Sequence, residues 1–283
     1  MNNVEILMSS YNGERYIREQ VESLLKQTIP VHITVRDDGS KDGTIGILSS
    51  YDGITVIEGK NQGATESFLS LIECAPEAEY YALCDQDDVW DPDKVEVAIE
   101  TIQQYSDKPA LYSGNTRLVD QELNFIKNET LNPETSLGSA IVKNYATGCT
   151  IVFNRKLMLE INQHRPEGIP FHDWWLNLVC LSVGGVSIYD TNPHMSYRQH
   201  GNNVVSGNDN AIKKWKARFK RYRTPYHRNI MAKQILDFYG NKVSDHNIDI
   251  LKSVMSCKWN SSLRTGNKID DFLFRWCILT KRI

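Results

Sequence analysis

The stretch YYALCDQDDVWDPDK, residues 80–94, decides the fold of this chain. Its apolar start predicts a buried strand over 80–84, and three carboxylates follow within four positions, at Asp85, Asp87 and Asp88. Open α/β sheets bind ligands at the carboxyl ends of their strands, so these side chains mark a candidate site. Asp85 and Asp87 lie on the same side of an extended chain, because side chains alternate between its two faces.

Two carboxylates this close repel each other, and a cation bound between them relieves the repulsion. Oxygen ligands of this kind suit Mg²⁺ or Mn²⁺. A structural alternative is that Asp87 and Asp88 cap a helix that begins near Pro92. On this stretch alone both interpretations stay open.

Composition limits the class of protein. The 283 residues carry a formal net charge of −3, which indicates no general affinity for nucleic acid. The six cysteines form no CxxC pair and mostly lie in apolar runs, which indicates reduced, buried thiols. Glu5 interrupts the apolar start, so we expect no signal peptide, and no apolar run of about 18 residues predicts a membrane span. We therefore expect a soluble, cytoplasmic protein.

Strands and helices alternate over the first part of the chain. Strands are expected at 4–10, 31–36, 54–59 and 80–84, and helices at 14–27, 65–75 and 92–105. Such alternation predicts a parallel sheet with helices on both faces. We assign residues 1–108 to a nucleotide-binding α/β unit.

Beyond Pro109 the pattern is less regular. We expect a strand at 110–120, a polar, turn-rich excursion at 124–136, a strand running into a helix at 147–157, a helix at 171–185 and a returning strand with a polar loop at 186–202. The remaining chain is helical, with segments at 213–223, 225–239, 245–260 and 268–281, and Gly240 as a helix stop. We place a boundary near residue 206.

Six blocks of this sequence, in this order, resemble the family-2 inverting glycosyltransferases of the GT-A fold, in particular their bacterial rhamnosyltransferase-like branch. The blocks are SSYNGE (9–14), RDDGSKDGT (36–44), CDQDDVWDPDK (84–94), TGCTIVFNR (147–155), HDWW (172–175) and YRQHGNN (197–203). The resemblance implies an α/β, Rossmann-like mixed sheet flanked by helices. It would form a GT-A domain over 1–206, with its acceptor half at 109–206, followed by a C-terminal helical region over 207–283.

The resemblance also implies a nucleotide site. In it Asp38 accepts a hydrogen bond from the base N3–H group. The other nucleotide-binding candidates are Ser10, Tyr11, Asn12, Gly13, Glu14 and Asp85. Tyr11, taken singly, is as easily an ordinary core aromatic. Asp37 and Asp42 are expected to close turns, since Asp and Gly favour them.

By the same resemblance Asp87 ligates a divalent ion, either Mn²⁺ or Mg²⁺, while Asp85 reaches the ion or the ribose. His200 is expected to contact the ion or the diphosphate. Arg198 is a further candidate for the diphosphate, because arginine suits bidentate recognition of oxyanions. Asp88 is expected to cap a helix or to support the metal ligands.

Asp173 is the expected general base, which would deprotonate the acceptor hydroxyl. The structural alternative is an aspartate stabilised by the dipole of the helix that it begins. His172 stands where the family often carries an acidic residue, which leaves its role open. The other candidate acceptor residues are Trp174, Trp175, Gly148 and Cys149. As an alternative, one of the two tryptophans belongs to the core.

The implied donor is dTDP-L-rhamnose, with a UDP-hexose as the alternative, and the implied acceptor is a saccharide linked to polyprenyl diphosphate. Segment 213–223, KKWKARFKRYR, would bind an anionic membrane surface, or simply form a solvated face. We expect no nucleic-acid partner, a lid over 204–210, and a C-terminus able to support a homo-oligomer. Two alternatives remain: an inactive nucleotide- or saccharide-binding module, and a dinucleotide oxidoreductase, which the lack of GxGxxG disfavours.

Overall fold

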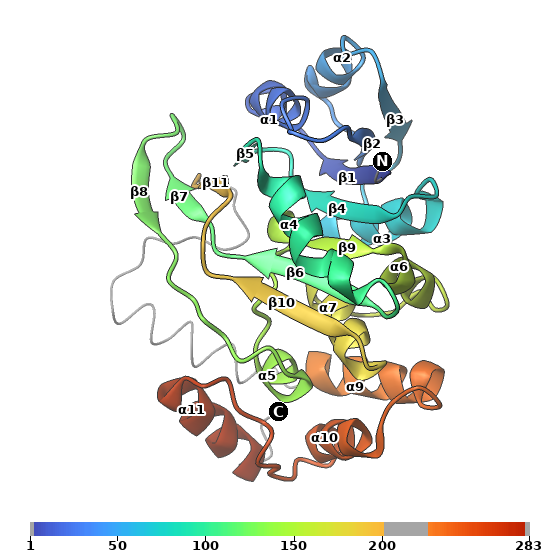
Figure 1. The fold of residues 1–283 in the computed structure, drawn as a ribbon, viewed down its shortest axis with the longest axis vertical. Coiled ribbons are helices and arrows are strands. Elements are labelled where there is room, and N and C mark those ends of the chain that lie inside the picture. The colour runs from blue at the N-terminus through green and yellow to red at the C-terminus, as the bar shows by residue number, and fades with distance from the viewer. Residues whose placement is uncertain (1–2, 201–225, 281–283) are drawn as a thin grey trace.

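The computed structural model describes residues 3–200 and 226–280. Its main sheet contains β1 (Val4–Ser10), β2 (His32–Asp37), β3 (Ile54–Glu58), β4 (Tyr80–Cys84), β6 (Ala110–Gly114), β9 (Val152–Asn154) and β10 (Val186–Asp190). The strand order is β10-β6-β9-β4-β1-β2-β3 (Figure 1). All neighbours are parallel except β9, which is antiparallel to both β4 and β6. The expected mixed α/β sheet is confirmed.

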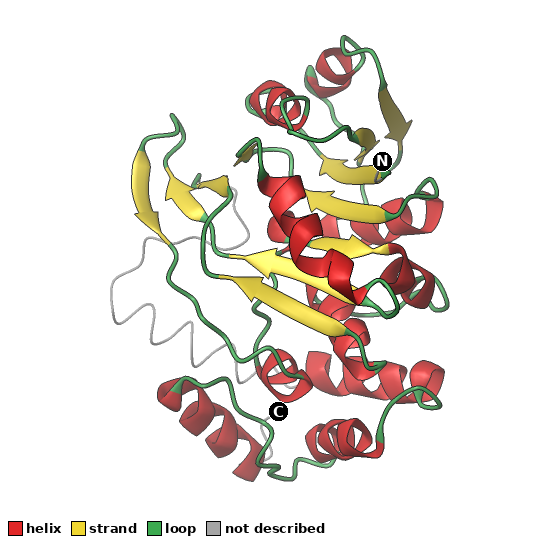
Figure 2. Cartoon of the chain, viewed as in Figure 1, coloured by secondary structure: helices red, strands yellow, loops and turns green. Residues whose placement is uncertain are grey.

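Helices cover both faces of this sheet, as Figure 2 shows. One face carries α1 (Ile17–Leu24), α2 (Thr44–Leu48) and α4 (Lys94–Ile102), and the other carries α3 (Ala64–Cys74), α6 (Arg155–Ile161) and α7 (His172–Ser182). Successive residues of β1 serve the two layers in turn. Ile6 and Met8 pack with α1 and α4, whereas Leu7 packs with α3 and α7. This two-sided burial explains why the strands are almost continuously apolar.

A smaller, four-stranded sheet stands beside the main one. It consists of β5 (Val89–Trp90), β11 (Met195–Arg198), β7 (Arg117–Val119) and β8 (Phe125–Asn128), in that order. The single strand expected over 110–120 is therefore wrong, since β6 and β7 belong to different sheets. Asn115 lies at the break and donates from its side-chain amide to Leu131 O and Thr191 O. The polar excursion over 124–136 likewise contains a strand, β8.

The C-terminal helices are α9 (Tyr226–Tyr239), α10 (Asp245–Met255) and α11 (Lys268–Leu279). In Figure 1 α9 lies beside α5 (Leu137–Val142), with α10 and α11 below, and all three share one hydrophobic cluster with α5 and α7. Helix α9 ends directly before Gly240, as expected. The expected basic helix 213–223, the boundary near 206 and the lid over 204–210 lie outside the described residues.

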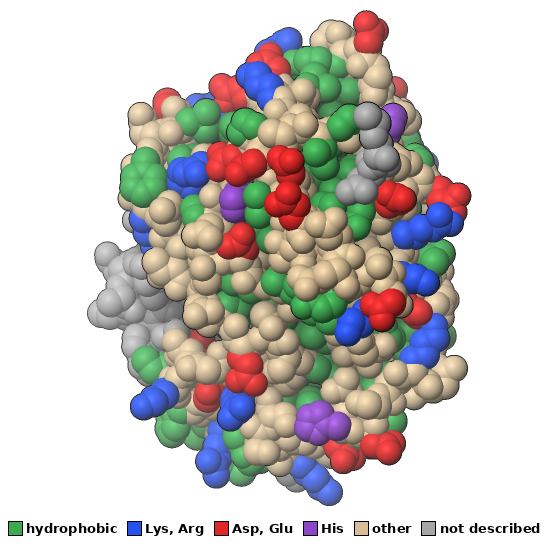
Figure 3. All heavy atoms as spheres, in the orientation of Figure 1, with side chains coloured by type: hydrophobic (Ala, Val, Ile, Leu, Met, Phe, Trp, Pro, Cys, Tyr) green, Lys and Arg blue, Asp and Glu red, His purple; other side chains and the backbone are tan. Residues whose placement is uncertain are grey.

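All six cysteines are free thiols, and four of them are buried, although Cys74 is exposed and Cys257 is half-buried. Within residues 3–200 and 226–280 no helix has the length and apolar character needed to cross a membrane. Charged side chains of both signs are interspersed on the face that Figure 3 shows, and the described residues there form no continuous basic stripe.

Candidate active site

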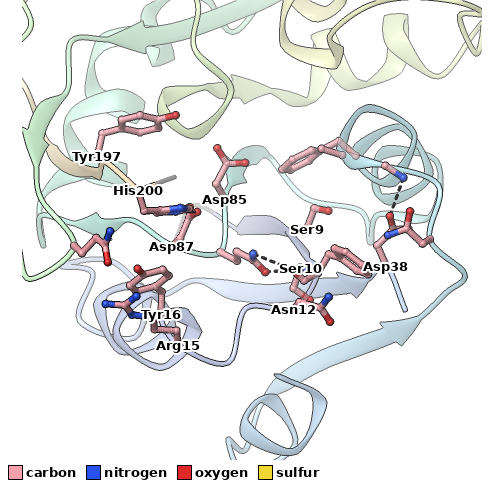
Figure 4. Close-up of a pocket in the computed structure, with 17 residues that line it drawn as sticks. Ser9, Ser10, Asn12, Arg15, Tyr16, Asp38, Asp85, Asp87, Tyr197 and His200 are labelled. Carbon is pink, nitrogen blue, oxygen red and sulfur yellow. Dashed lines mark hydrogen bonds and ion pairs between the residues drawn. The ribbon is translucent and has the colours of Figure 1, made fainter. Parts of the chain in front are cut away.

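A cavity of about 670 Å³ opens at the carboxyl ends of β1, β2 and β4 (Figure 4). This volume lies within the usual range of about 300–1,000 Å³ for small-molecule sites. Its lining residues are Ser9, Ser10, Tyr11, Asn12, Arg15, Tyr16, Asp38, Asn61, Gly63, Ala64, Phe68, Asp85, Gln86, Asp87, Gln121, Tyr197 and His200. Seven of the residues singled out in the sequence therefore meet in one place: Ser10, Tyr11, Asn12, Asp38, Asp85, Asp87 and His200.

Gln86 holds the loop that follows β1. Its side chain accepts a hydrogen bond from Tyr11 N at 2.8 Å and donates one to Tyr11 O at 3.1 Å. Gly13 leaves room for this contact, because a Cβ there would lie 2.3 Å from Gln86 Oε1. Tyr11 is 44% exposed, so the core alternative for it is wrong. Glu14 turns away from the cavity and accepts from Gly43 N.

Asp37 and Asp38 have different tasks at the end of β2. Asp37 accepts from the backbone amides of Gly39 and Ser40, which confirms its expected turn-closing role. Asp38 is buried, forms an ion pair with Arg36 and accepts from the amides of residues 62–63, which close the neighbouring loop. The Asp38 carboxylate therefore lines the cavity and is held in place by Arg36 and these two amides.

Asp85, Asp87 and His200 lie together on one side of the cavity, opposite Asp38 (Figure 4). His200 Nε2 donates to Asp87 Oδ2 at 2.7 Å. Burial, followed by repulsion from Asp87 and Asp173, raises the pKa of Asp85 to about 7. Among the described residues, no positive charge contributes to lowering the pKa of Asp85. Asp85 and Asp87 are half-buried and face the cavity. Their oxygens therefore fit a hard divalent cation.

Asp88 points into the interior rather than the cavity. It accepts the backbone N–H of Arg198 at 3.1 Å and the thiol of Cys149. Helix α4 begins only at Lys94, with Asp93 at its N-cap position, so the capping alternative for Asp87 and Asp88 is wrong.

A second group of potential ligand atoms lies beneath the cavity. One oxygen each of Asp85 and Asp88 and the Sγ of Cys149 all lie within 4.8 Å of one another. Asp88 and Cys149 are buried, however, and burial raises the pKa of the Cys149 thiol well above its usual range. A buried, protonated thiol is a poor ligand for Mg²⁺ or Mn²⁺. The oxygens that face the cavity are the better set, and Cys149 itself lies away from the cavity wall.

Arg198 does not line the cavity, which corrects its expected place beside a diphosphate. The side chain is buried, and its Nε donates to Asp87 O at 2.8 Å. The guanidinium also contacts Gln121 O and the carboxylate of Glu19. Its donors are therefore engaged by the protein itself.

Asp173 lies in the first turn of α7 and is not among the residues that line the cavity. Its carboxylate accepts from Gly148 N at 3.0 Å, from Trp174 N at 2.6 Å and from the side chain of Asn144. Burial outweighs these hydrogen bonds and raises the pKa of Asp173 to about 7. The charge of Asp173 also raises the pKa of Asp85, so the two carboxyl groups interact electrostatically. An acid with such a pKa can take up and release a proton near neutral pH.

His172 stacks on Phe68, with ring centroids 4.0 Å apart, and Phe68 lines the cavity. Burial lowers the pKa of His172 to about 3, so the imidazole is neutral. Trp175 is fully buried, and Trp174 is 7% exposed and donates to Ala140 O. The expected apolar wall for a sugar is wrong for both tryptophans, because α7 turns them into the hydrophobic core.

Several cavity residues escaped the sequence interpretation, namely Arg15, Tyr16, Phe68, Gln86, Gln121 and Tyr197. Gln86 lies within one of the quoted blocks and Tyr16 lies just after another, so their sequence positions could have indicated that they belong to the site. Tyr197 reaches the cavity from β11 of the smaller sheet and Gln121 from the turn between β7 and β8, and no local pattern indicates the pairing of these strands.

The chain matches the family model described as glycosyl transferase family 2 over residues 5–161, more than half of its length. It is 30% identical over 237 residues to a dTDP-rhamnosyl transferase, RfbG, of Shigella flexneri, covering 76% of this chain and 77% of that protein. The chain therefore belongs to glycosyl transferase family 2 and is a glycosyltransferase.

Further similarities extend the comparison. TuaG of Bacillus subtilis, a putative teichuronic acid biosynthesis glycosyltransferase, is 29% identical over 226 residues, or 77% of this chain and 85% of that one. The structure of S. aureus TarS 1–349 with UDP-GlcNAc superposes with a TM-score of 0.64 at 18% identity, covering 90% and 72% of the two chains. The mannosyltransferase PcManGT of Pyrobaculum calidifontis, with GDP-Man and Mn²⁺, gives a TM-score of 0.57 at 15% identity, covering 99% and 74%. These neighbours share the GT-A fold.

Proposed function

We propose that this enzyme transfers a sugar, with inversion at the anomeric carbon, from a nucleoside-diphosphate donor to a hydroxyl group of a saccharide. The observation that carries the proposal is that Asp85, Asp87 and His200 line one cavity, with His200 bonded to Asp87, while the charges of both Asp87 and Asp173 raise the pKa of Asp85. A site for the diphosphate and a site for proton removal would then meet at the sugar.

In this proposal the loop after β1 and the end of β2 hold the nucleotide. Tyr11 is exposed at the cavity wall, where its ring can stack on the base. Asp38 would accept the N3–H of uracil or thymine, and Ser10 and Asn12 would line the ribose. Asp85 would reach the ribose or the ion.

Asp87, Asp85 and His200 would hold Mn²⁺ or Mg²⁺. When bound, the ion supplies positive charge that stabilises the diphosphate as it leaves. The residues themselves fit this role, because they present two carboxylates and an imidazole to one side of a cavity.

Asp173 is the proposed base. It would take the proton of the acceptor hydroxyl as that oxygen forms a bond to the anomeric carbon and the bond from this carbon to the diphosphate breaks. Three hydrogen bonds hold the carboxylate in place at the start of α7, so its direction is fixed before the acceptor arrives. The neutral His172 lies directly beside it.

L-Rhamnose is the preferred sugar, since the relative RfbG is described as a dTDP-rhamnosyl transferase. The alternative is a UDP-sugar, which the UDP-GlcNAc complex of the structural neighbour TarS favours. Both bases offer Asp38 the same N3–H group.

The acceptor would belong to a cell-surface polysaccharide, as the description of the relative TuaG suggests. A growing saccharide of this kind linked to polyprenyl diphosphate would reach the enzyme at an anionic membrane. The sequence 213–223 carries seven Lys or Arg residues, each able to contribute about 1 kcal/mol at such a surface. Flotation with anionic liposomes tests this part, and a variant with these residues neutralised should remain unbound.

A thermal-shift panel of dTDP-rhamnose and UDP-sugars, each with and without Mn²⁺, tests the donor and the ion together. A ligand that binds only the native protein raises its melting temperature. We expect the largest shift with dTDP-rhamnose and Mn²⁺, and loss of most of that shift with EDTA. A larger shift with a UDP-sugar would reassign the donor, and chelator-resistant shifts and turnover would contradict the metal site.

A further inference from the structure

Arg198 does not line the cavity, yet its side chain contacts several segments of the chain around it. It lies at the end of β11 and is 1% exposed. Its guanidinium contacts three separate segments: it donates to Asp87 O, to Gln121 O and to the carboxylate of Glu19 on α1. A charged group this deeply buried needs all such partners to compensate for the loss of water.

The backbone of the same residue is also held. The N–H group of Arg198 donates to Asp88 Oδ1 at 3.1 Å, so the residue contacts both Asp87 and Asp88. In Figure 1 β11 lies beside β5, although the two strands are far apart in the sequence. The two strands pair over only two residues each, so this short ladder alone fixes their relative position weakly.

Tyr16 extends the contact to His200. The Cζ of Arg198 lies 4.7 Å from the centre of the Tyr16 ring, and that ring stacks on the His200 imidazole with centroids 5.1 Å apart. His200 in turn donates to Asp87 at 2.7 Å. Figure 4 shows Tyr16 directly beside His200 and Asp87. Arg198 therefore touches the backbone of one candidate metal ligand and the aromatic support of another.

We propose that Arg198 is a positioning residue for the candidate cation site. Its buried guanidinium fixes the Asp87 backbone relative to Tyr16 and so sets the direction from which His200 meets Asp87. The inference rests on the proposed function, in which Asp87 and His200 hold the cation.

This role differs from direct contact with a diphosphate. A guanidinium that binds the donor must present N–H groups to the cavity. In Arg198 the Nε, Nη1 and Nη2 atoms instead donate to Asp87 O, Gln121 O and the Glu19 carboxylate. Arg15, which does line the cavity, is the better placed arginine for the donor. The two roles predict different losses when Arg198 is changed.

Arg198→Lys is the test variant, since it keeps the charge but cannot reach three separate partners. Arg117→Lys is the matched control. Arg117 belongs to the same sheet and forms a bidentate pair with Asp91, at 3.1 and 2.9 Å, but it does not line the cavity. If Arg198→Lys does not fold, Glu19→Ala removes the carboxylate partner of the guanidinium from the half-exposed side.

Two quantities are measured on the nucleotide-free protein. The first is the Mn²⁺ affinity, from the electron paramagnetic resonance of free Mn²⁺. The second is the ¹⁵N nuclear magnetic resonance spectrum of the imidazole nitrogens, in which the His200 signals are identified because they disappear in His200→Gln. We expect Arg198→Lys to weaken Mn²⁺ binding about 10–100-fold, the range found when groups that orient metal ligands are removed. The His200 signals should move toward those of a freely exposed imidazole. Arg117→Lys should change neither readout.

Unchanged Mn²⁺ affinity and unchanged His200 signals, with weaker binding of the nucleoside diphosphate alone, would overturn the inference and assign Arg198 to the donor. If the native protein binds no Mn²⁺, the metal part of the proposed function fails separately. The His200 signals then decide on Arg198 alone, because a shift supports positioning and no shift contradicts it.

Discussion

Asp173 combines two properties that a single carboxylate rarely has. It is held by three hydrogen bonds, which favour the ionised form, yet burial raises its pKa to about 7. The local sequence could only indicate an aspartate at the start of a helix, a position where the helix dipole stabilises negative charge. Its electrostatic interaction with Asp85, a residue distant in the sequence, distinguishes it from an ordinary first-turn aspartate.

Asp173→Asn should lower the transfer rate about 10²–10⁴-fold, because the amide cannot accept the acceptor proton. Donor binding should remain within a factor of about two, measured by calorimetry beside the initial rate. Asp245→Asn is the control, since Asp245 lies in the first turn of α10 and tests the helix-dipole effect alone. Near-normal turnover of Asp173→Asn would remove Asp173 as the base.

The transfer rate should rise with pH as Asp173 loses its proton, with a midpoint near its pKa of about 7 rather than near 4. The contribution of Asp173 to stability has the opposite trend, because its pKa is raised in the folded state. That contribution is fully present below about pH 4 and is lost as the pH rises through about 7. A kcat/KM profile from pH 5 to 9 measures the first effect, and a profile that is flat above pH 5 would contradict it.

At the scale of elements, the loop after β1 and the loop after β4 form one unit through Gln86. The sequence correctly predicted strands β1 to β4, since their apolar runs and turn residues are local signals. The sequence interpretation missed the smaller sheet, because it did not predict β7, β8 and β11 as separate strands. These strands have three or four residues each, and pairing between distant segments fixes them rather than their own pattern.

Gly13→Ala should weaken nucleotide binding more than it weakens folding. The new Cβ would lie 2.3 Å from Gln86 Oε1, and the flexible Gln86 side chain can yield only by leaving Tyr11. Each lost hydrogen bond should weaken the binding free energy by about 1 kcal/mol, which raises the dissociation constant of a nucleoside diphosphate roughly fivefold per bond. The binding is measured by calorimetry.

Gly46→Ala is the control for this substitution. Nothing lies within 4 Å of a Cβ there, and in α2 the alanine should raise the free energy of unfolding by about 0.5–1 kcal/mol. Equal nucleotide affinity in Gly13→Ala and the native protein would show that the Gln86 contact does not shape the binding loop.

At the scale of the whole molecule, the C-terminal helices complete the core on one side of the main sheet. Ile235, Leu251 and Phe274, one from each of α9 to α11, belong to the same hydrophobic cluster as Trp175 on α7. This packing explains why both tryptophans after Asp173 are buried. Helices α5 and α7 therefore depend on the C-terminal helices for their packing.

Gly138→Ala should destabilise the whole protein. Its Cβ would lie 1.9 Å from Ser262 O, a backbone atom of the segment between α10 and α11 that cannot rotate away. Overpacking of this kind costs about 1–3 kcal/mol of the free energy of unfolding, measured by urea denaturation with Gly46→Ala as the reference. A variant as stable as the native protein would mean that this segment is not packed against α5.

Local sequence is enough to predict the alternation of strands and helices, the turn chemistry of Asp37 and the cluster of carboxylates after β4, because each depends on residues close together in the chain. Tertiary structure alone decided which carboxylate faces the cavity, that Asp88 and Arg198 turn inward, and that the tryptophans after Asp173 enter the core. The physical reason is burial: whether a side chain meets solvent, a ligand or a partner depends on elements that arrive from distant parts of the chain, and no local pattern records their arrival.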